Sequence, residues 1–319
     1  AICIKFERDN GLTYQPDEIM VSTGAKQSIA NLMMALVNPG DEVIVPAPYW
    51  VSYADLAEFV GGTVVSPKAG IEQNFKITPA QLAAAISPKT KLLIFSSPNN
   101  PSGAMYSHEE LEALAVILRH HPQIWVISDE IYEYIQYGTK HVSLASLAGM
   151  RDRTATVNGL SKGFAMTGWR LGYMGAPLAL AKACEKIQSQ VTSGASSIAQ
   201  RAAIAAMLAG PSAVQYMVDA FTSRRQLLAD GLNAADKLII KVPEGAFYLF
   251  VDASAYLSPK HPTALDLCML LLEGGVASVP GEAFGLDGYI RFSYAASEED
   301  LKKAAERIVR TLNGLNSAL

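Results

Sequence analysis

The stretch KLLIFSSPNNPSG, residues 91–103, begins with a run of apolar residues that ends in a turn rich in proline and asparagine. A short run that is apolar on both faces predicts a strand buried between two layers. Similar runs occur at 18–23, 42–48, 61–67, 124–130 and 154–159, and helical patterns separate several of them. Strands of this kind alternating with helices predict an α/β fold with a mostly parallel sheet covered by helices.

The pattern changes after about residue 210. Long helices are predicted at 179–210 and 214–235, and the remaining strands (245–252, 275–281, 289–295) are grouped with helices at 263–273 and 297–312. We therefore predict a large domain over 13–212 and a smaller α+β domain over 213–319. Residues 1–12 resemble the remnant of an N-terminal segment, a helix that ends at Asn10 and Gly11.

Composition excludes several classes of protein. Lys and Arg (26) nearly balance Asp and Glu (30), so the net charge of -4 gives no surface for nucleic acid. No apolar stretch approaches the roughly 18 residues of a membrane span. The three cysteines lie far apart and fit neither a disulfide framework nor a zinc site, which favours a cytoplasmic location. The five histidines show no metal-ligand spacing, and no GxGxxG, P-loop or GxSxG motif occurs.

Polar residues follow the predicted strands, where functional groups of a parallel sheet gather. Asp129 closes an apolar strand and is either a helix cap or a buried carboxylate with a cationic partner. Lys162 and Arg170 lie in a glycine-rich stretch without acids, which is either an exposed basic loop or a nucleophilic amine beside an anion site. A lysine, an aspartate, asparagines, tyrosines and an arginine at strand ends suit a carbonyl cofactor held as a Schiff base.

These motifs together resemble one known family. The series GAKQ, PGDEVIVPAPYWVSY, SPNNPSG, SDEIY, NGLSKGFAMTGWRLGY, GAFY, VPGEAFG and YIRFSYA, over about 13–312, is similar to the class I aminotransferases, bacterial aspartate aminotransferase subgroup. The resemblance implies the fold of type I pyridoxal 5'-phosphate (PLP)-dependent transferases. It also implies PLP as cofactor and transamination of aspartate with 2-oxoglutarate to oxaloacetate and glutamate.

The resemblance assigns roles to individual residues. Lys162 matches the lysine that bonds the cofactor and moves the substrate proton, and Asp129 the carboxylate that pairs with the ring nitrogen. The remaining cofactor contacts are the phosphate cradle, the ring stack and the donors to the phenolic oxygen. The phosphate cradle is assigned to Gly24, Ala25, Lys26, Ser161 and Arg170. The ring stack is assigned to Trp50, and the donors to the phenolic oxygen are Tyr132 and Asn100.

The substrate contacts are also assigned by resemblance. Arg291 matches the arginine that binds the α-carboxylate, with Trp50 and Asn100 beside it. Lys26 is either the group that binds a distal carboxylate or a solvated lysine at a helix start.

The resemblance leaves open the oligomeric state, the role of an N-terminal segment and the substrate. The family forms homodimers with shared active sites, and its members carry a further N-terminal stretch that contributes to the substrate and phosphate sites. The motifs identify the cofactor more firmly than they identify the pocket for the substrate side chain. An aromatic, prephenate or kynurenine aminotransferase is therefore an alternative, as is a non-catalytic PLP-binding module of a regulator. Ser102, where the family has threonine, is a minor departure.

Overall fold

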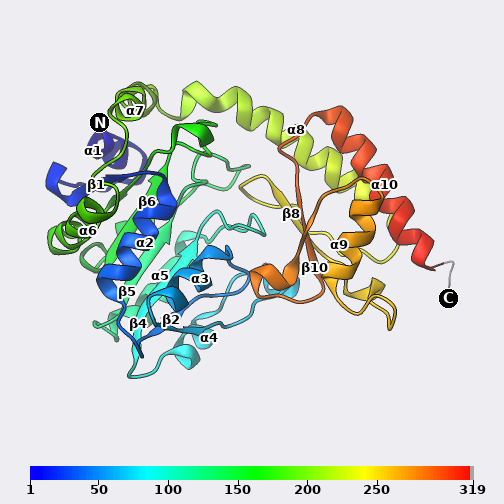
Figure 1. Ribbon diagram of the computed structural model, residues 1–319, viewed down its shortest axis with the longest axis horizontal. Coiled ribbons are helices and arrows are strands. Elements are labelled where there is room, and N and C mark those ends of the chain that lie inside the picture. Colours follow the sequence, from blue (N-terminus) through cyan, green and yellow to red (C-terminus); the bar gives the residue numbers. More distant parts are fainter. Residues whose placement is uncertain (317–319) are drawn as a thin grey trace.

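The computed structural model describes residues 1–316, which form two sheets covered by helices (Figure 1). The larger sheet has seven strands in the order β1-β7-β6-β5-β4-β2-β3. Its strands are β1 (Ile19–Ser22), β2 (Glu42–Ile44), β3 (Thr63–Val65), β4 (Thr90–Ser96), β5 (Trp125–Asp129), β6 (Thr154–Gly159) and β7 (Gly172–Gly175). Strand β7 runs antiparallel to both its neighbours, β1 and β6, and all other neighbouring strands of this sheet are parallel, so the predicted mostly parallel sheet is confirmed.

The central strand β4 shows why the large sheet is apolar on both faces. Leu92 and Ile94 pack with helices α2 (Ala25–Leu36), α3 (Ser52–Phe59) and α6 (Leu178–Val191) on one face. Leu93 and Phe95 pack with α4 (Pro79–Ala85) and α5 (His108–Arg119) on the other. Successive side chains of a strand point to opposite faces, so a two-sided core requires the continuous apolar run seen in the sequence.

The second unit is built on three antiparallel strands, in the order β8 (Tyr248–Asp252), β10 (Tyr289–Ser293) and β9 (Val279–Pro280). Three helices pack on this sheet around one apolar core: α8 (Gln215–Leu232), α9 (Ala264–Glu273) and α10 (Glu298–Asn316). In Figure 1 helix α8 runs from the large unit across to the small one. The α+β character of this part is as predicted, while the boundary at residues 212 and 213 stays a prediction.

Helix ends follow the local sequence closely. Thr78 and Ser107 each cap a helix through the reciprocal side-chain and backbone hydrogen bonds of a capping box. At the N-terminus, α1 (Ile2–Lys5) continues into a π-helical turn (Phe6–Asn10). Gly11 ends this turn in the left-handed region at φ 65°.

Two predictions differ from the structure. The single helix predicted at 179–210 is two helices, α6 and α7 (Ser197–Ala209). The chain turns between them at Ser193, which adopts a left-handed φ of 62° next to Gly194. Strand β7 was not predicted, because GYMG is short and glycine-rich and shows no strand pattern of its own. In the described part of the chain, no helix is long and apolar enough to cross a membrane.

Candidate active site

A cavity of about 400 Å³ lies where the carboxyl ends of the large sheet's strands meet the small sheet. This size suits a small organic ligand. The cavity brings together every residue assigned to the site from the sequence except Gly24, which precedes the lining residue Ala25. The lining consists of Ala25, Lys26, Trp50, Tyr53, Ser96, Asn100, Asp129, Ile131, Tyr132, Ser161, Lys162, Thr167, Arg170, Tyr248 and Arg291.

Asp129, the last residue of β5, carries the buried carboxylate of the pocket. Burial raises its pKa to about 6, although it accepts hydrogen bonds from the Tyr53 hydroxyl (2.6 Å) and the Ile131 amide (3.2 Å). Within residues 1–316 no cationic side chain forms an ion pair with it. The carboxylate is therefore both a local cap and a buried acid, and a ligand with a protonated ring nitrogen would supply the missing cation.

Lys162 lies in the turn after β6 and is partly buried, with Nζ 5.8 Å from the ring centre of Tyr132. Burial lowers the pKa of this amine, and Arg291 and Arg170 lower it further against the opposing charge of Asp129. A lysine with a lowered pKa is more often neutral and so is a better nucleophile. The arrangement favours the nucleophilic amine over the exposed basic loop, although Arg170 itself is exposed.

The start of helix α2 and Arg170 form a site suited to an anion. Gly24 caps α2 with φ 88°, and a Cβ on it would lie 2.5 Å from the Arg170 guanidinium. A Cβ on Gly172 in β7 would overlap the backbone nitrogen of Ala25. Free N–H groups at the N-terminus of a helix attract negative charge, and the glycines let the backbone and the arginine approach closely. A phosphate group fits this cradle.

Arg291, on β10, reaches into the pocket from the small sheet. Its Nη1 donates to Asn100 Oδ1 (2.8 Å), and the guanidinium lies 4.5 Å from the ring centre of Tyr248. Its Nε is buried without a hydrogen-bond partner among the described residues. A guanidinium with an unused donor is suited to bind a carboxylate through two parallel hydrogen bonds. At the mouth, the exposed Lys26 places Nζ 4.8 Å from the ring centre of Trp50.

Comparison with known proteins decides the family. The model of the aminotransferase class I and II family matches residues 1–308. The chain belongs to this family. The resemblance inferred from the motifs is thus confirmed, and with it the type I fold of PLP-dependent transferases.

Three relatives show how far the similarity extends. A bifunctional aspartate aminotransferase and glutamate/aspartate-prephenate aminotransferase of Petunia hybrida is 49% identical over 323 residues, covering 98% of this chain and 67% of the relative. An aspartate aminotransferase of Rhizobium meliloti (strain 1021) is 46% identical over 325 residues, covering 99% and 79%. A crystal structure of the aspartate aminotransferase from Rhizobium meliloti aligns with a TM-score of 0.94 at 45% identity, covering 98% and 80%.

Two tyrosines of this aminotransferase pocket were not singled out from the sequence. Tyr53 donates to Asp129, and the Tyr248 hydroxyl shares a hydrogen bond of 2.8 Å with that of Tyr132. Tyr53 lies inside the motif PYWVSY and Tyr248 inside GAFY, and these motifs are the sequence signal that could have identified them. Their partners could not be inferred, because Tyr53 meets Asp129 only through the order of β2, β4 and β5, and Tyr248 comes from the other sheet.

Proposed function

We propose that this chain is a PLP-dependent aminotransferase whose main reaction transfers the amino group of aspartate to 2-oxoglutarate. The observation that carries the proposal is one pocket that holds a buried carboxylate, a lysine of lowered pKa and an arginine with a free donor. These are Asp129, Lys162 and Arg291. The site roles assigned to the individual residues belong to this proposal.

The pocket residues divide the work of holding the cofactor. When bound, PLP would supply an electron-withdrawing ring that stabilises negative charge at the substrate Cα. Asp129 would keep the ring nitrogen protonated, and Tyr132 and Asn100 would donate to the phenolic oxygen. The phosphate would lie on the amides of Ala25 and Lys26 and on Ser161 and Arg170, with Trp50 stacked on the ring.

Lys162 has two functions in this proposal. Its Nζ would hold the cofactor covalently and, once released, would take the proton from the substrate Cα. Both functions need a neutral amine, and burial next to Arg291 and Arg170 lowers the pKa in the required direction.

Substrate selection would depend on two cations at different depths. Arg291 would bind the α-carboxylate common to all amino acids, while Lys26, at the mouth over Trp50, would bind the distal carboxylate of aspartate. The name of the Petunia relative includes prephenate, so a prephenate substrate is the second candidate. An aromatic or kynurenine substrate and a non-catalytic regulator module remain predictions that turnover assays would decide.

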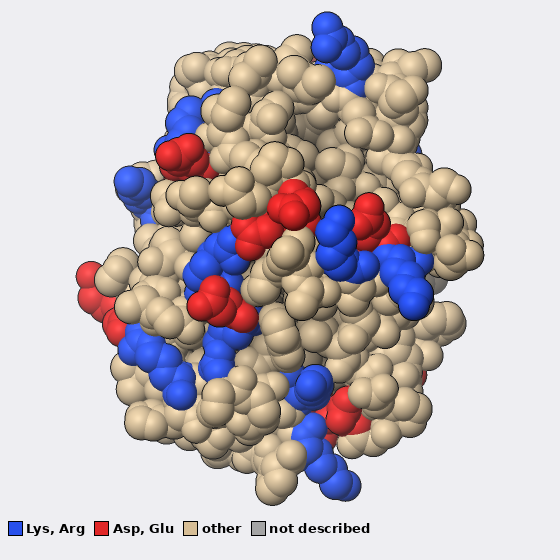
Figure 2. Space-filling view, turned by 90° about the vertical axis from the view of Figure 1, so that its left-hand side faces the viewer, with Lys and Arg blue, Asp and Glu red and all other residues tan. Residues whose placement is uncertain are grey.

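We also propose a homodimer in the cytoplasm. Helices α6 and α7 expose Val191, Ile198 and Leu208, and Tyr216 at the start of α8 is exposed as well. On the face seen in Figure 2, acidic and basic side chains lie next to one another, and broad uncharged areas surround them. Exposed apolar residues in such number are typical of a protein interface. The cytoplasmic location is supported by three cysteines that are free in the structure.

The cofactor assignment is tested by chemical trapping. Purified chain is incubated with PLP, reduced with borohydride and digested, and the modified peptide is identified by mass spectrometry. We expect the cofactor on Lys162 together with conversion of aspartate and 2-oxoglutarate to oxaloacetate and glutamate. Labelling of Lys26 or Lys182 in place of Lys162 would contradict the assignment, and trapping at Lys162 without turnover would support the regulator module.

A further inference from the structure

Glu130, the residue after Asp129, does not line the pocket and is fully buried. Its Oε1 accepts hydrogen bonds from the hydroxyls of Ser128 (2.9 Å) and Ser143 (2.7 Å), and its Oε2 lies 3.4 Å from Asn10 Nδ2. An ionised carboxylate only accepts hydrogen bonds, and these donors match that form. Immediately behind the pocket there is therefore a second buried carboxylate with its own polar surroundings.

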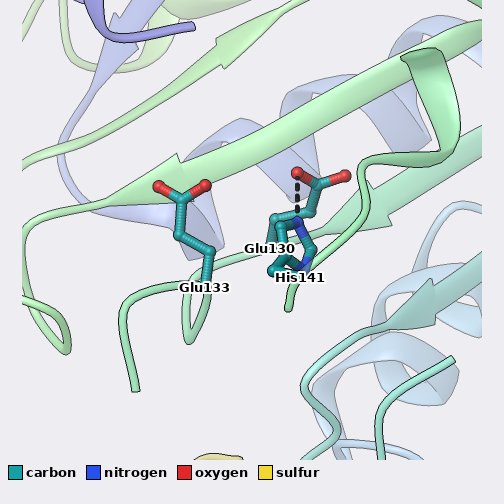
Figure 3. Close-up of side chains that lie close together, drawn as sticks. All are labelled: Glu130, Glu133 and His141. Carbon is teal, nitrogen blue, oxygen red and sulfur yellow. Dashed lines mark hydrogen bonds and ion pairs between the residues drawn. The ribbon is translucent and has the colours of Figure 1, made fainter. Parts of the chain in front are cut away.

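Two basic groups and one more acid complete this cluster. Glu133 forms an ion pair with Lys5 of α1, and both side chains are buried. His141 Nε2 lies 2.9 Å from Glu130 Oε2, and the ring is buried. Figure 3 shows Glu130 and His141 facing each other, with Glu133 beside them. Asn10 accepts from Lys5 (2.7 Å) and donates to Glu133 (2.9 Å), and its contact with Glu130 links this pair to the other one.

The charge of the cluster depends on His141. With a neutral ring, two carboxylates face one ammonium, and one buried negative charge is left uncompensated, which is costly. With a charged ring the four groups sum to zero. Burial lowers the pKa of His141 and Lys5 opposes its charge, but the carboxylates of Glu130 and Glu133 outweigh both and raise the pKa above its ordinary value of 6.5.

The other titratable groups around the cluster do not provide the missing charge. Asp9 is paired with Arg8 (2.6 Å) and accepts from the Tyr134 hydroxyl (2.5 Å). Tyr173 faces the same carboxylates, and burial raises the pKa values of both tyrosines, so they stay neutral near pH 8. Lys140, next to His141 in sequence, is exposed. On the pocket side, Asp129 has a pKa of about 6 and is ionised above pH 7.

We propose that His141 is a positioning residue for the pocket: its charged form completes a neutral clasp of two acids and two bases. The clasp consists of Lys5, Glu130, Glu133 and His141. It fixes both ends of the segment 130–133, whose middle residues Ile131 and Tyr132 line the pocket, and ties this segment to helix α1. The claim about the clasp is independent of the ligand; its importance for catalysis rests on the proposed function.

The same groups could be taken for a metal site, because ligand atoms of Glu130, Glu133 and His141 lie within 4.8 Å of one another. Two observations argue for the clasp. The Glu133 carboxylate is already paired with the ammonium of Lys5, and the His141 Nε2 is already bonded to Glu130, so that only the buried Nδ1 of the ring has no partner among the described residues. A cation in this space would have to displace Lys5 or leave its buried charge next to a second cation.

The clasp predicts a specific dependence on pH. A histidine whose pKa is raised by folding stabilises the folded state below its unfolded pKa, and this stabilisation is lost as the pH rises through the folded pKa. Each unit by which the pKa is raised corresponds to about a tenfold change in the equilibrium between closed and open forms. Protection of the amides of 2–10 and 130–133 should therefore fall as the pH rises from 6 to 9.5.

The experiment compares the wild type with His141→Gln, because glutamine keeps an N–H donor for Glu130 but carries no charge. Hydrogen exchange followed by mass spectrometry, corrected for the intrinsic rates, gives protection factors across this range with and without PLP. His120→Gln, at the exposed end of α5, is the matched control. We expect the wild type to be better protected than His141→Gln at pH 6 and the difference to shrink towards pH 9.5, with the control like the wild type.

A second measurement needs no variant that could fail to fold. The Cε1 signal of His141 in histidine-labelled wild type gives its pKa directly, with the signals of His108, His120, His121 and His261 assigned by substitution of each residue. A pKa above 6.5 supports the clasp, and a pKa at or below 6.5 overturns it, as does equal protection of the wild type and His141→Gln at pH 6. Stoichiometric binding of Zn²⁺ at this signal would also overturn it. Failure to bind PLP would contradict only the proposed function, since these measurements are also made without cofactor.

Discussion

Replacing Tyr53 by phenylalanine removes one hydroxyl, and the structure sets the expected cost. The hydroxyl donates to Asp129 Oδ2 at 2.6 Å, while the ring keeps its edge contact with Trp50. Both side chains are almost fully buried, so water can approach the place of the lost donor only from the pocket. A hydrogen bond to an ionised group contributes about 1.5–3 kcal/mol, and one to a neutral group about 0.5–1.5 kcal/mol. The cost of Tyr53→Phe should therefore depend on whether Asp129 is ionised.

The direction of the pH dependence follows from the pKa of Asp129, which burial raises to about 6 from the ordinary 3.8. A raised carboxyl pKa costs stability above the folded pKa, and this cost decreases as the pH falls from the folded pKa towards the ordinary one. Without the Tyr53 hydroxyl the pKa should rise further, by roughly one unit, because the ionised form loses about 1–1.5 kcal/mol more than the neutral form. The free energy of unfolding should thus fall by about 1.5–3 kcal/mol at pH 8 but by only about 0.5–1.5 kcal/mol at pH 5.

The assay is urea unfolding of the cofactor-free chain at both pH values, with Tyr106→Phe as control. The Tyr106 hydroxyl is also buried, but it accepts from the Ile77 amide (3.0 Å), a neutral partner. The control should lose a similar amount of stability at pH 5 and pH 8. An equal loss at both pH values in Tyr53→Phe would refute the reasoning, because it would show that the hydroxyl does not act on an ionised Asp129.

Two further predictions concern catalysis. Asp129→Ala should retain PLP through its phosphate, measured by absorbance after gel filtration, but lose several kcal/mol of transition-state stabilisation, about 10³-fold or more in kcat; a near-normal kcat would reduce Asp129 to a strand-end cap. Arg291→Leu should lower kcat/KM for all amino acids alike, whereas Lys26→Ala should lower it roughly tenfold to a hundredfold for aspartate and glutamate only. Equal losses for aspartate and phenylalanine in the Lys26 variant would remove the distal-carboxylate assignment.

The features that were predictable from the sequence are those fixed by neighbouring residues. The two-sided apolar run at β4 required a sheet covered on both faces, and Thr78 and Ser107 marked helix starts through hydrogen bonds within one turn. Part of the pocket was predictable because Asn100, Asp129 and Lys162 end or follow strands of a parallel sheet, whose carboxyl ends lie at one edge. Trp50 and Arg291 were assigned only by the resemblance to the family.

Features that depend on distant partners were not predictable in this way. The four residues of β7 form a strand only because β1 and β6 flank them. The break at Ser193 is a different case, because the pair Ser193–Gly194 is a local turn signal that the prediction of one long helix overlooked. The pairing of Lys5 with Glu133 spans most of the large unit's chain, and nothing near either residue indicates the other.

The close approach of Gly172 to the Ala25 nitrogen restricts how this pocket can evolve. A Cβ at position 172 would overlap the backbone at the start of α2, so even alanine would push the anion-binding amides away from Arg170. New substrate preferences must therefore arise at positions with open space around them, such as the exposed Lys26 at the mouth. In a set of laboratory-evolved variants selected for new amino acids, position 172 should stay glycine while position 26 changes freely.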